Sequence, residues 1–428
     1  MDPKYLDSRG RPRIVITGVG AVTPVGLTAD ESWQSVLSGK SGIGKITQFD
    51  AAGMPCQIAG EVKGFDAADF MNFKEARRMA RCSHLSVAAC KMAMDDAGLT
   101  EDAPDPERRG VVVGVGMGGL ERVIENLQIL WNKGLARVNP FALTSALPNM
   151  PAHHVSLLAQ AQGPISTVVA ACATGTQAIG EGAEMIRRGV ADTILAGGAE
   201  GLINEAAIAG FSAMRALSVG FNDCPEKACR PFDRDRDGFI LSEGAGIVIL
   251  ERLDKAIARG ARIYAEFRGH ASSSDAFHVA APDPDGAGAI RAMKWSLDDA
   301  GVNTDDVSYI NAHGTSTPVN DATETLAIKK LFGEQAYNIP VTSTKSVTGH
   351  AMGGAGAIEA IFCAYALKDG VVPPTWNYET PDPECDLDYV PNNPRQADIE
   401  ITLSNSFGLG GQNACLVLGR YENGRNKQ

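Results

Sequence analysis

The chain has 428 residues, of which 44% are hydrophobic and 21% are charged, and its formal net charge is −12 at pH 7. This composition is typical of a folded globular protein and excludes a disordered, collagen-like or disulfide-scaffold chain. The acidic balance excludes nucleic acid as the main partner, because binding to phosphates requires a basic surface.

Apolar, β-branched segments alternate with helical patterns along the chain, after a polar N-terminus. Residues 1–13 lack the apolar core of a signal peptide, and no run of about 18 apolar residues follows, so we predict a cytoplasmic protein without membrane insertion. The expected strands are Arg13–Thr17, Gly110–Val115, Ile165–Ala170, Thr193–Ala196, Ala245–Leu250, Val307–Asn311 and Ile399–Ser404. This alternation predicts an α/β fold with parallel or mixed sheets.

Two short internal similarities indicate that the chain has two related halves. Residues 91–99 (KMAMDDAGL) resemble residues 294–302 (KWSLDDAGV), and the helix end RRGV at 187–190 resembles KDGV at 368–371. Repeated segments of this kind favour repeated structural units over unrelated domains. We therefore predict an N-terminal half, 1–260, and a C-terminal half, 261–428, that share one core.

Three motifs that resemble ligand sites have a plainer structural interpretation. Gly114–Gly119 (GVGMGG) fits a dinucleotide loop, but the residues after it predict a helix where that fingerprint requires a strand with an acidic end. Asp233–Gly238 begins like a calcium loop, yet Gly244 occupies its twelfth position. His153 and His154 have no partner at metal-ligand spacing, and the nine cysteines include no CxxC pair. We predict no metal site and no disulfide framework.

One cysteine and two histidines stand on glycine-rich turns. Cys172 follows the strand Ile165–Ala170 in a tight turn, ACATGT, at the start of a helix, where the free N–H groups favour a thiolate. His313 follows a strand in NAHGTST, and His350 precedes a second Gly- and Ala-rich helix in KSVTGHAMGG. Each residue alone is more typical of a buried structural position. Together they predict an acyl-transfer site.

These motifs are together similar to the β-ketoacyl-[acyl-carrier-protein] synthases of thiolase-like fold, specifically the elongating synthase II type. The similarity extends from Arg13 to Arg420. The segments that carry it are Ile16–Gly26, Ala171–Cys172, Leu195–Glu200, Arg230–Asp233, Asp237–Phe239, Asn311–Thr317, Lys345–His350 and Asn405–Gly411. The resemblance implies a five-layered αβαβα fold built from two pseudo-symmetric βαβαβαββ halves, and a homodimer.

The resemblance also implies the catalytic set. Cys172 would be the acylated nucleophile, and His313 and His350 would complete a Cys-His-His site. Lys345 and Glu359 match the supporting charged pair of the family. No metal or redox cofactor is required for this chemistry.

Further positions match residues that bind substrate in the family. Thr315 and Thr317 would contact the phosphopantetheine arm. Phe407 matches a gate residue whose backbone N–H joins that of Cys172 in the oxyanion hole. Met117 matches a position that lines the acyl tunnel. The chain departs from the family pattern at Ala171, Ala280, Leu409 and Gln412, none of which removes a catalytic group.

The implied partner is an acyl carrier protein, loaded with an acyl or a malonyl group. Carrier proteins are acidic, so docking on this acidic chain requires a local basic surface. Lys74, Arg77 and Arg78, on a helix predicted over 74–81, supply one, although a solvated helix face would look the same.

The function implied is a condensation of fatty acid biosynthesis. The acyl group moves to Cys172, malonyl-carrier is decarboxylated, and the product is a 3-oxoacyl-carrier longer by two carbons. A ketosynthase of a type II polyketide pathway is the alternative that shares every motif. A non-catalytic chain-length-type subunit would lack Cys172, an initiating synthase would have Asn in place of His350, and a degradative thiolase would have a second cysteine in the 408–413 loop.

Overall fold

The computed structural model describes residues 2–422. One mixed ten-stranded sheet has the order β10-β9-β13-β14-β8-β1-β7-β6-β4-β5. Its strands are β1 Ile14–Val22, β4 Arg109–Val115, β5 Ile165–Ser166, β6 Thr193–Glu200, β7 Gly244–Arg252, β8 Ala265–Ser274, β9 Tyr309–Asn311, β10 Val341–Thr342, β13 Ile401–Gly408 and β14 Gln412–Gly419. Strand β1 joins the two parts of the sheet: it pairs with β7 along nearly its whole length but with β8 only at Ile14–Ile16.

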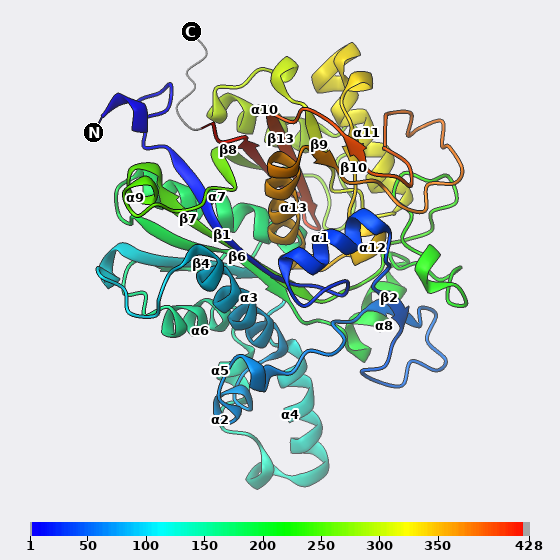
Figure 1. The fold of residues 1–428 in the computed structure, drawn as a ribbon. Helices are drawn as coiled ribbons and strands as arrows, with labels where there is room; N and C mark the ends of the chain where they lie inside the picture. The colour runs from blue at the N-terminus through cyan, green and yellow to red at the C-terminus, as the bar shows by residue number, and fades with distance from the viewer. Residues whose placement is uncertain (1, 423–428) are drawn as a thin grey trace.

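The helices and the two parts of the sheet form five layers (Figure 1). The central layer contains α7 (Thr174–Arg187) and α13 (Ala355–Asp369), which contact each other and strands of both parts. Helix α3 (Arg81–Ala97) covers β1, β7 and β6 from outside, while α10 (Ala287–Ala300) covers β8 and β14. This α-β-α-β-α arrangement agrees with the architecture that the sequence predicts.

The remaining elements surround these layers. They are α1 Ala29–Ser38, α2 Phe73–Ala76, α4 Leu120–Lys133, α5 Ala142–Ala146, α6 Met150–Leu158, α8 Glu205–Ala213, α9 Leu253–Ala258, α11 Pro318–Phe332, α12 Lys345–Thr348 and the strand pairs β2 Ile43–Lys45 with β3 Ile58–Gly60 and β11 Val371–Val372 with β12 Arg395–Gln396. Across residues 2–422, none of the helices has both the length and the apolar character needed to cross a bilayer.

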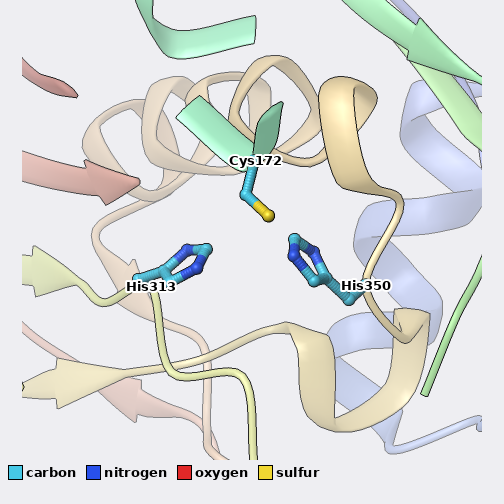
Figure 2. Close-up of side chains that lie close together, drawn as sticks. All are labelled: Cys172, His313 and His350. Carbon is cyan, nitrogen blue, oxygen red and sulfur yellow. The ribbon is translucent and has the colours of Figure 1, made fainter. Parts of the chain in front are cut away.

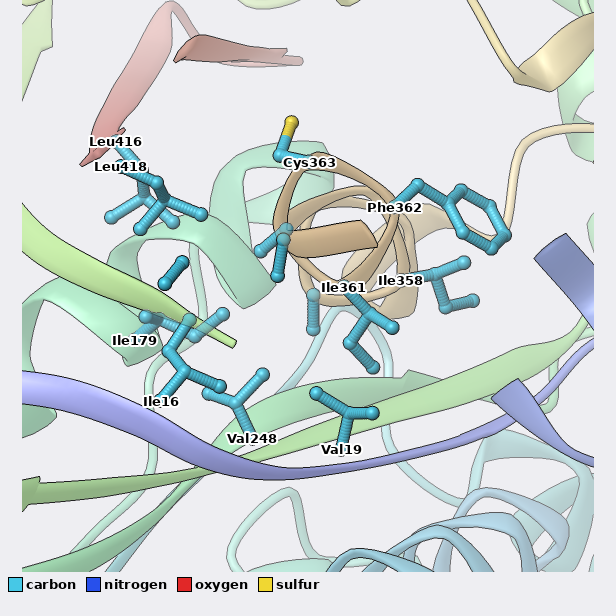
Figure 3. Close-up of a cluster of buried hydrophobic side chains, with 14 of the residues drawn as sticks. Ile16, Val19, Ile179, Val248, Ile358, Ile361, Phe362, Cys363, Leu416 and Leu418 are labelled. Carbon is cyan, nitrogen blue, oxygen red and sulfur yellow. The ribbon is translucent and has the colours of Figure 1, made fainter. Parts of the chain in front are cut away.

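Helix α13 lies in the centre of the core because it has no polar face. All but its last two residues are buried, as expected for a helix that is apolar on every side. Figure 3 shows α13 between Val19 and Val248 on one side and Leu416 and Leu418 on the other. Small residues on α7 allow a close crossing, since a Cβ on Gly175 would lie 2.7 Å from the backbone nitrogen of Ala357.

The two internal similarities of the sequence correspond to matching local structures. Helix α3 ends at Gly98 (φ 65°) and α10 ends at Gly301 (φ 66°), each in the left-handed conformation that closes a helix. The central helices α7 and α13 both begin after a short 3-10 turn, Ala171–Ala173 and Met352–Gly354 respectively.

Two local predictions are wrong. The expected buried strand Ile165–Ala170 is a strand only over Ile165–Ser166, because it lies at the edge of the sheet and the chain then leaves to form the cysteine turn. Ile165 is 54% exposed. The helix expected over 74–81 is interrupted, since α2 ends at Ala76 and α3 begins at Arg81.

Candidate active site

A cavity of about 450 Å³ opens where the central helices meet the loops of the sheet. Cys172, His313 and His350 line it, together with Thr315, Thr317 and Phe407. Cys172 comes from the 3-10 turn before α7, His313 from the loop after β9, and His350 from the loop after α12. In Figure 2 the cysteine sulfur points toward the space between the two imidazoles.

The turns before the two central helices hold residues of the cavity in a strained backbone conformation. Ala171, just before the cysteine, has φ 47°, and Met352, which lines the cavity, has φ 43°. A left-handed non-glycine residue costs about 1–3 kcal/mol and persists only when its neighbours hold it. On the cysteine side, the N–H of Ala170 donates to Thr174 Oγ1 at 2.8 Å. The strain therefore lies at the entrances of α7 and α13, next to the reactive side chains.

The three side chains are close enough to act on one substrate atom. One donor atom from each of Cys172, His313 and His350 lies within 4.8 Å of the others. The imidazole centroids are 5.4 Å apart with planes at 82°, and the Phe407 ring is 5.9 Å from the His313 ring. Within residues 2–422, His313 Nδ1 and both ring nitrogens of His350 are buried and have no hydrogen-bond partner. Buried polar atoms are normally paired, so these nitrogens are suited to a ligand.

Burial favours the neutral forms of the cysteine thiol and of the two imidazoles. It raises the pKa of the Cys172 thiol to about 11, although a backbone hydrogen bond from Leu409 and the cation of Lys345 oppose that rise. Burial also holds the pKa of His313 and of His350 well below the ordinary value, and Lys345 lowers both further. These shifts favour the protonated thiol and the neutral imidazoles, against the thiolate expected from the helix start, which stays a prediction.

Lys345 and Glu359 form a buried ion pair, with side chains 1% and 4% exposed. Burial raises the pKa of the Glu359 carboxyl, against the effect of the lysine beside it. This pair places one cation next to both imidazoles and the thiol.

The backbone N–H that hydrogen-bonds the thiol belongs to Leu409, two residues beyond the predicted Phe407. Gly408 between them packs against the same turn, because a Cβ there would lie 3.2 Å from the backbone nitrogen of Cys172. The phenylalanine instead contributes its ring to the cavity wall. The glycines on both sides of Leu409 permit this close backbone approach to the cysteine turn, and the role of the Phe407 N–H in the oxyanion hole stays a prediction.

Comparison with known proteins identifies the family. Residues 11–256 match the family described as "Beta-ketoacyl synthase, N-terminal domain", and residues 264–379 match "Beta-ketoacyl synthase, C-terminal domain". The chain belongs to the β-ketoacyl synthase family. It is 48% identical to the "3-oxoacyl-[acyl-carrier-protein] synthase 2" of Synechocystis sp. over 96% of this chain and 99% of the relative.

Solved structures of synthases share the fold. The chain superposes on "The ishigamide ketosynthase/chain length factor" with a TM-score of 0.90 and 36% identity, over 96% of this chain and all of that one. It superposes with a TM-score of 0.89 and 34% identity, at the same coverage, on a ketosynthase solved as "type II PKS acyl-carrier protein in complex with its ketosynthase bound to the hexaketide". The predicted thiolase-like fold and the predicted class, a condensing acyltransferase of fatty acid synthesis, are confirmed.

One buried carboxylate of the synthase site was missed by sequence reasoning. Glu324, on α11, accepts the backbone N–H groups of His313 and Gly314, each at 2.8 Å. Burial raises the pKa of Glu324 to about 7 despite these donors. It holds the loop that carries His313. The available signal was its place in the helix that follows the NAHGTST loop.

The remaining predicted residues lie in three places: the cavity lining, the turn after β4, and the exposed surface at α2. Thr315 and Thr317 line the cavity with their hydroxyls 3.0 Å apart. Met117 is 49% exposed in the turn between β4 and α4, outside the cavity lining of this single chain. Lys74, on α2, is exposed, as are the two arginines that follow that helix.

Two clusters in the described part of the synthase have donor atoms arranged as metal ligands are. The first is the cysteine–histidine set itself, and the second comprises Glu184, His270 and Asp299. Arg11 and Arg187 already pair with Asp299 at 2.5 and 2.9 Å, which disfavours a cation there. The first carboxylate of the loop Asp233–Gly238, that of Asp233, is already bound by Arg230 and by three backbone N–H groups.

Proposed function

We propose that this synthase extends an acyl chain by two carbons, through an acyl-enzyme on Cys172. The observation that carries the proposal is the convergence of one thiol and two neutral imidazoles, with unpartnered nitrogens, in a single cavity. Such a set can form a thioester and then stabilise a carbanion, which are the two demands of a condensation.

In the first half-reaction, Cys172 Sγ bonds to the carbonyl carbon of the acyl-carrier thioester. The thiol proton moves to a neutral imidazole as the sulfur attacks, and then to the departing pantetheine thiolate. The backbone N–H groups of Cys172 and Phe407 are the donors proposed for the oxyanion, and the N–H of Leu409, which hydrogen-bonds the thiol, is a further candidate. Thr315 and Thr317 offer hydroxyls to the pantetheine arm.

In the second half-reaction, malonyl-carrier loses carbon dioxide, and the electron pair of the broken C–C bond stays on the carrier-bound fragment as an enolate. His313 and His350 donate to the enolate oxygen, which neutral rings can do because each carries one N–H. The enolate carbon then bonds to the acyl carbon on Cys172, and the C–S bond breaks to release the 3-oxoacyl-carrier. The Lys345–Glu359 pair stabilises the neutral state of the rings through its cation.

An acidic acyl carrier protein is the proposed partner. Lys74, Arg77 and Arg78 form an exposed basic surface, in which the Arg78 guanidinium lies 4.7 Å from the Phe141 ring. At the cavity mouth the lining includes a further exposed cation, Arg215. Rim charges of this kind mainly govern association rate.

A homodimer is the proposed assembly. Between residues 117 and 169 the chain exposes an unusual number of large apolar side chains, a feature that marks association surfaces. They are Met117, Leu127, Leu130, Trp131, Leu135, Phe141, Leu143, Leu147, Leu157, Ile165 and Val169. Edge strand β5 lies within this surface and leaves a row of backbone groups open to pairing. Sedimentation equilibrium at twice the mass of the chain would support the dimer, and a single-chain mass would refute it.

A polyketide ketosynthase is the second candidate, because the similar structures include a ketosynthase bound to a hexaketide. The 48% identity to a 3-oxoacyl-[acyl-carrier-protein] synthase 2 favours the fatty acid pathway. Incubation with acyl-carrier, followed by mass spectrometry, should place the acyl group on the Cys172 peptide, and added malonyl-carrier should yield the 3-oxoacyl product. Cys172→Ala should abolish both, with the fold intact. Acylation of Cys224 or Cys415 instead would refute the assignment.

A further inference from the structure

A buried carboxylate outside the cysteine–histidine set connects two turns behind the cavity. Glu200, the last residue of β6, is fully buried. Its Oε2 accepts the backbone N–H of Gly116 at 2.9 Å and that of Gly353 at 3.2 Å, while Oε1 lies 3.4 Å from the N–H of Met117. One side chain therefore fixes backbone from two distant parts of the sequence.

The glycines at these positions are what permits the contact. A Cβ on Gly116 would lie 2.5 Å from Glu200 Oε2, and a Cβ on Gly353 would lie 2.4 Å from the Gly116 nitrogen. Both are closer than side-chain carbons approach such atoms. We do not expect the glycine-rich motif Gly114–Gly119 to bind a dinucleotide. Its role in the structure is to present the backbone N–H of Gly116 to the Glu200 carboxylate.

Each of the two fixed turns carries a methionine next to a glycine that Glu200 binds. Met352, beside Gly353, lines the cavity with Cys172 and is held at φ 43°. Met117, beside Gly116, projects half-exposed from the other turn. Under the proposed function, a short acyl group on Cys172 would meet Met352, and we expect a longer chain to extend beyond it to Met117.

We propose that Glu200 is a positioning residue that sets acyl-chain preference by holding the turns of Met117 and Met352 in register. This inference rests on the proposed function, since it assumes an acyl group on Cys172. Burial raises the pKa of Glu200 to about 7, so an uncharged acceptor of the same shape is a fair mimic of the side chain. Glutamine keeps one oxygen that can bridge both N–H groups, whereas leucine keeps the volume and removes the acceptor.

The test compares Glu200→Leu and Glu200→Gln with a matched control, Glu61→Leu. Glu61 is also buried and accepts two backbone N–H groups, those of Thr47 and Gln48, but away from the cavity lining. The measurement is the rate of acyl-cysteine formation with four-, eight- and twelve-carbon acyl-carriers. Because Glu200→Leu leaves both turns without their shared acceptor, it should lower the twelve-carbon to four-carbon rate ratio by about tenfold. Glu200→Gln and Glu61→Leu should leave that ratio within about twofold of the parent.

A uniform fall across all three donors in Glu200→Leu would overturn the proposal, as would a glutamine variant indistinguishable from leucine. If the leucine variant does not fold, Glu200→Asp, whose shorter side chain withdraws the acceptor from both turns, must show the same change in the rate ratio.

Hydrogen exchange at the amides of residues 116–117 and 353 provides a readout that needs no acyl transfer. If these amides exchange equally slowly in the parent and in a folded Glu200→Leu variant, Glu200 does not hold the two turns, and the proposal is overturned. If the parent enzyme itself transfers no acyl group to Cys172, the proposed function is refuted instead.

Discussion

Removal of either imidazole should strongly impair the decarboxylation of malonyl-carrier. His313 and His350 are 3% and 2% exposed, their ring centroids are 5.4 Å apart, and each has a nitrogen without a partner among residues 2–422. In the proposed mechanism the two rings share the enolate oxygen, so an alanine variant leaves one donor. Loss of one preorganised oxyanion donor costs about 100- to 1,000-fold in rate, or about 2.7–4 kcal/mol.

The assay isolates decarboxylation in a Cys172→Gln background, where no acyl group can be transferred to the cysteine. Release of carbon dioxide from malonyl-carrier is then measured for His313→Ala and His350→Ala. His350→Asn retains an amide N–H and should recover about tenfold of the loss. The control is His278→Ala, because His278 lines the same cavity but is exposed at its mouth.

Two results would contradict the shared-donor mechanism. One is a full decarboxylation rate in either alanine variant. The other is an equal loss in His278→Ala, which would attribute the effect to a disturbed cavity and not to a missing donor.

Three further outcomes are expected. Reversal of Arg77 and Arg78 to Glu should raise the apparent KM for acyl-carrier with little change in kcat, and an unchanged KM at low salt would place docking elsewhere. Met117→Phe should suppress transfer of eight- and twelve-carbon chains while sparing four-carbon chains, and a uniform drop would mean that this side chain does not meet the acyl group. Glu359→Gln leaves a buried lysine unpaired and should cost about 3–5 kcal/mol in chemical denaturation, whereas Asp386→Asn, in an exposed pair with Lys329, should cost at most about 1 kcal/mol.

The parts of this site that the sequence predicts correctly are those with local signals. A cysteine at the start of a Gly- and Ala-rich helix, and histidines in turns after a strand or before such a helix, are recognisable within about ten residues. Cys172, His313 and His350 are of this kind, and the structure brings them into one cavity. The alternation of strands and helices likewise predicts the α/β layers without knowledge of any contact.

The parts that the sequence does not predict depend on contacts between distant segments. Glu200 bridges backbone 84 and 153 residues away, and nothing near it in sequence indicates this. Burial, which is a property of the whole fold, raises the pKa of the cysteine, against the effect expected from the helix start. The strand at Ile165 is cut short by its place at the sheet edge. The division at residue 260, the homodimer and the cytoplasmic location stay predictions.

Proton movement in the proposed first half-reaction follows from the same burial. The pKa of Cys172 is about 11, and those of His313 and His350 are held well below the ordinary histidine value. A preformed thiolate–imidazolium pair is therefore unfavourable. The sulfur must therefore lose its proton as the bond to the thioester carbon forms, when the negative charge passes to an oxyanion held by backbone N–H groups. The Lys345 cation assists in two ways, because it favours the anion on sulfur and keeps the rings neutral for the enolate that follows.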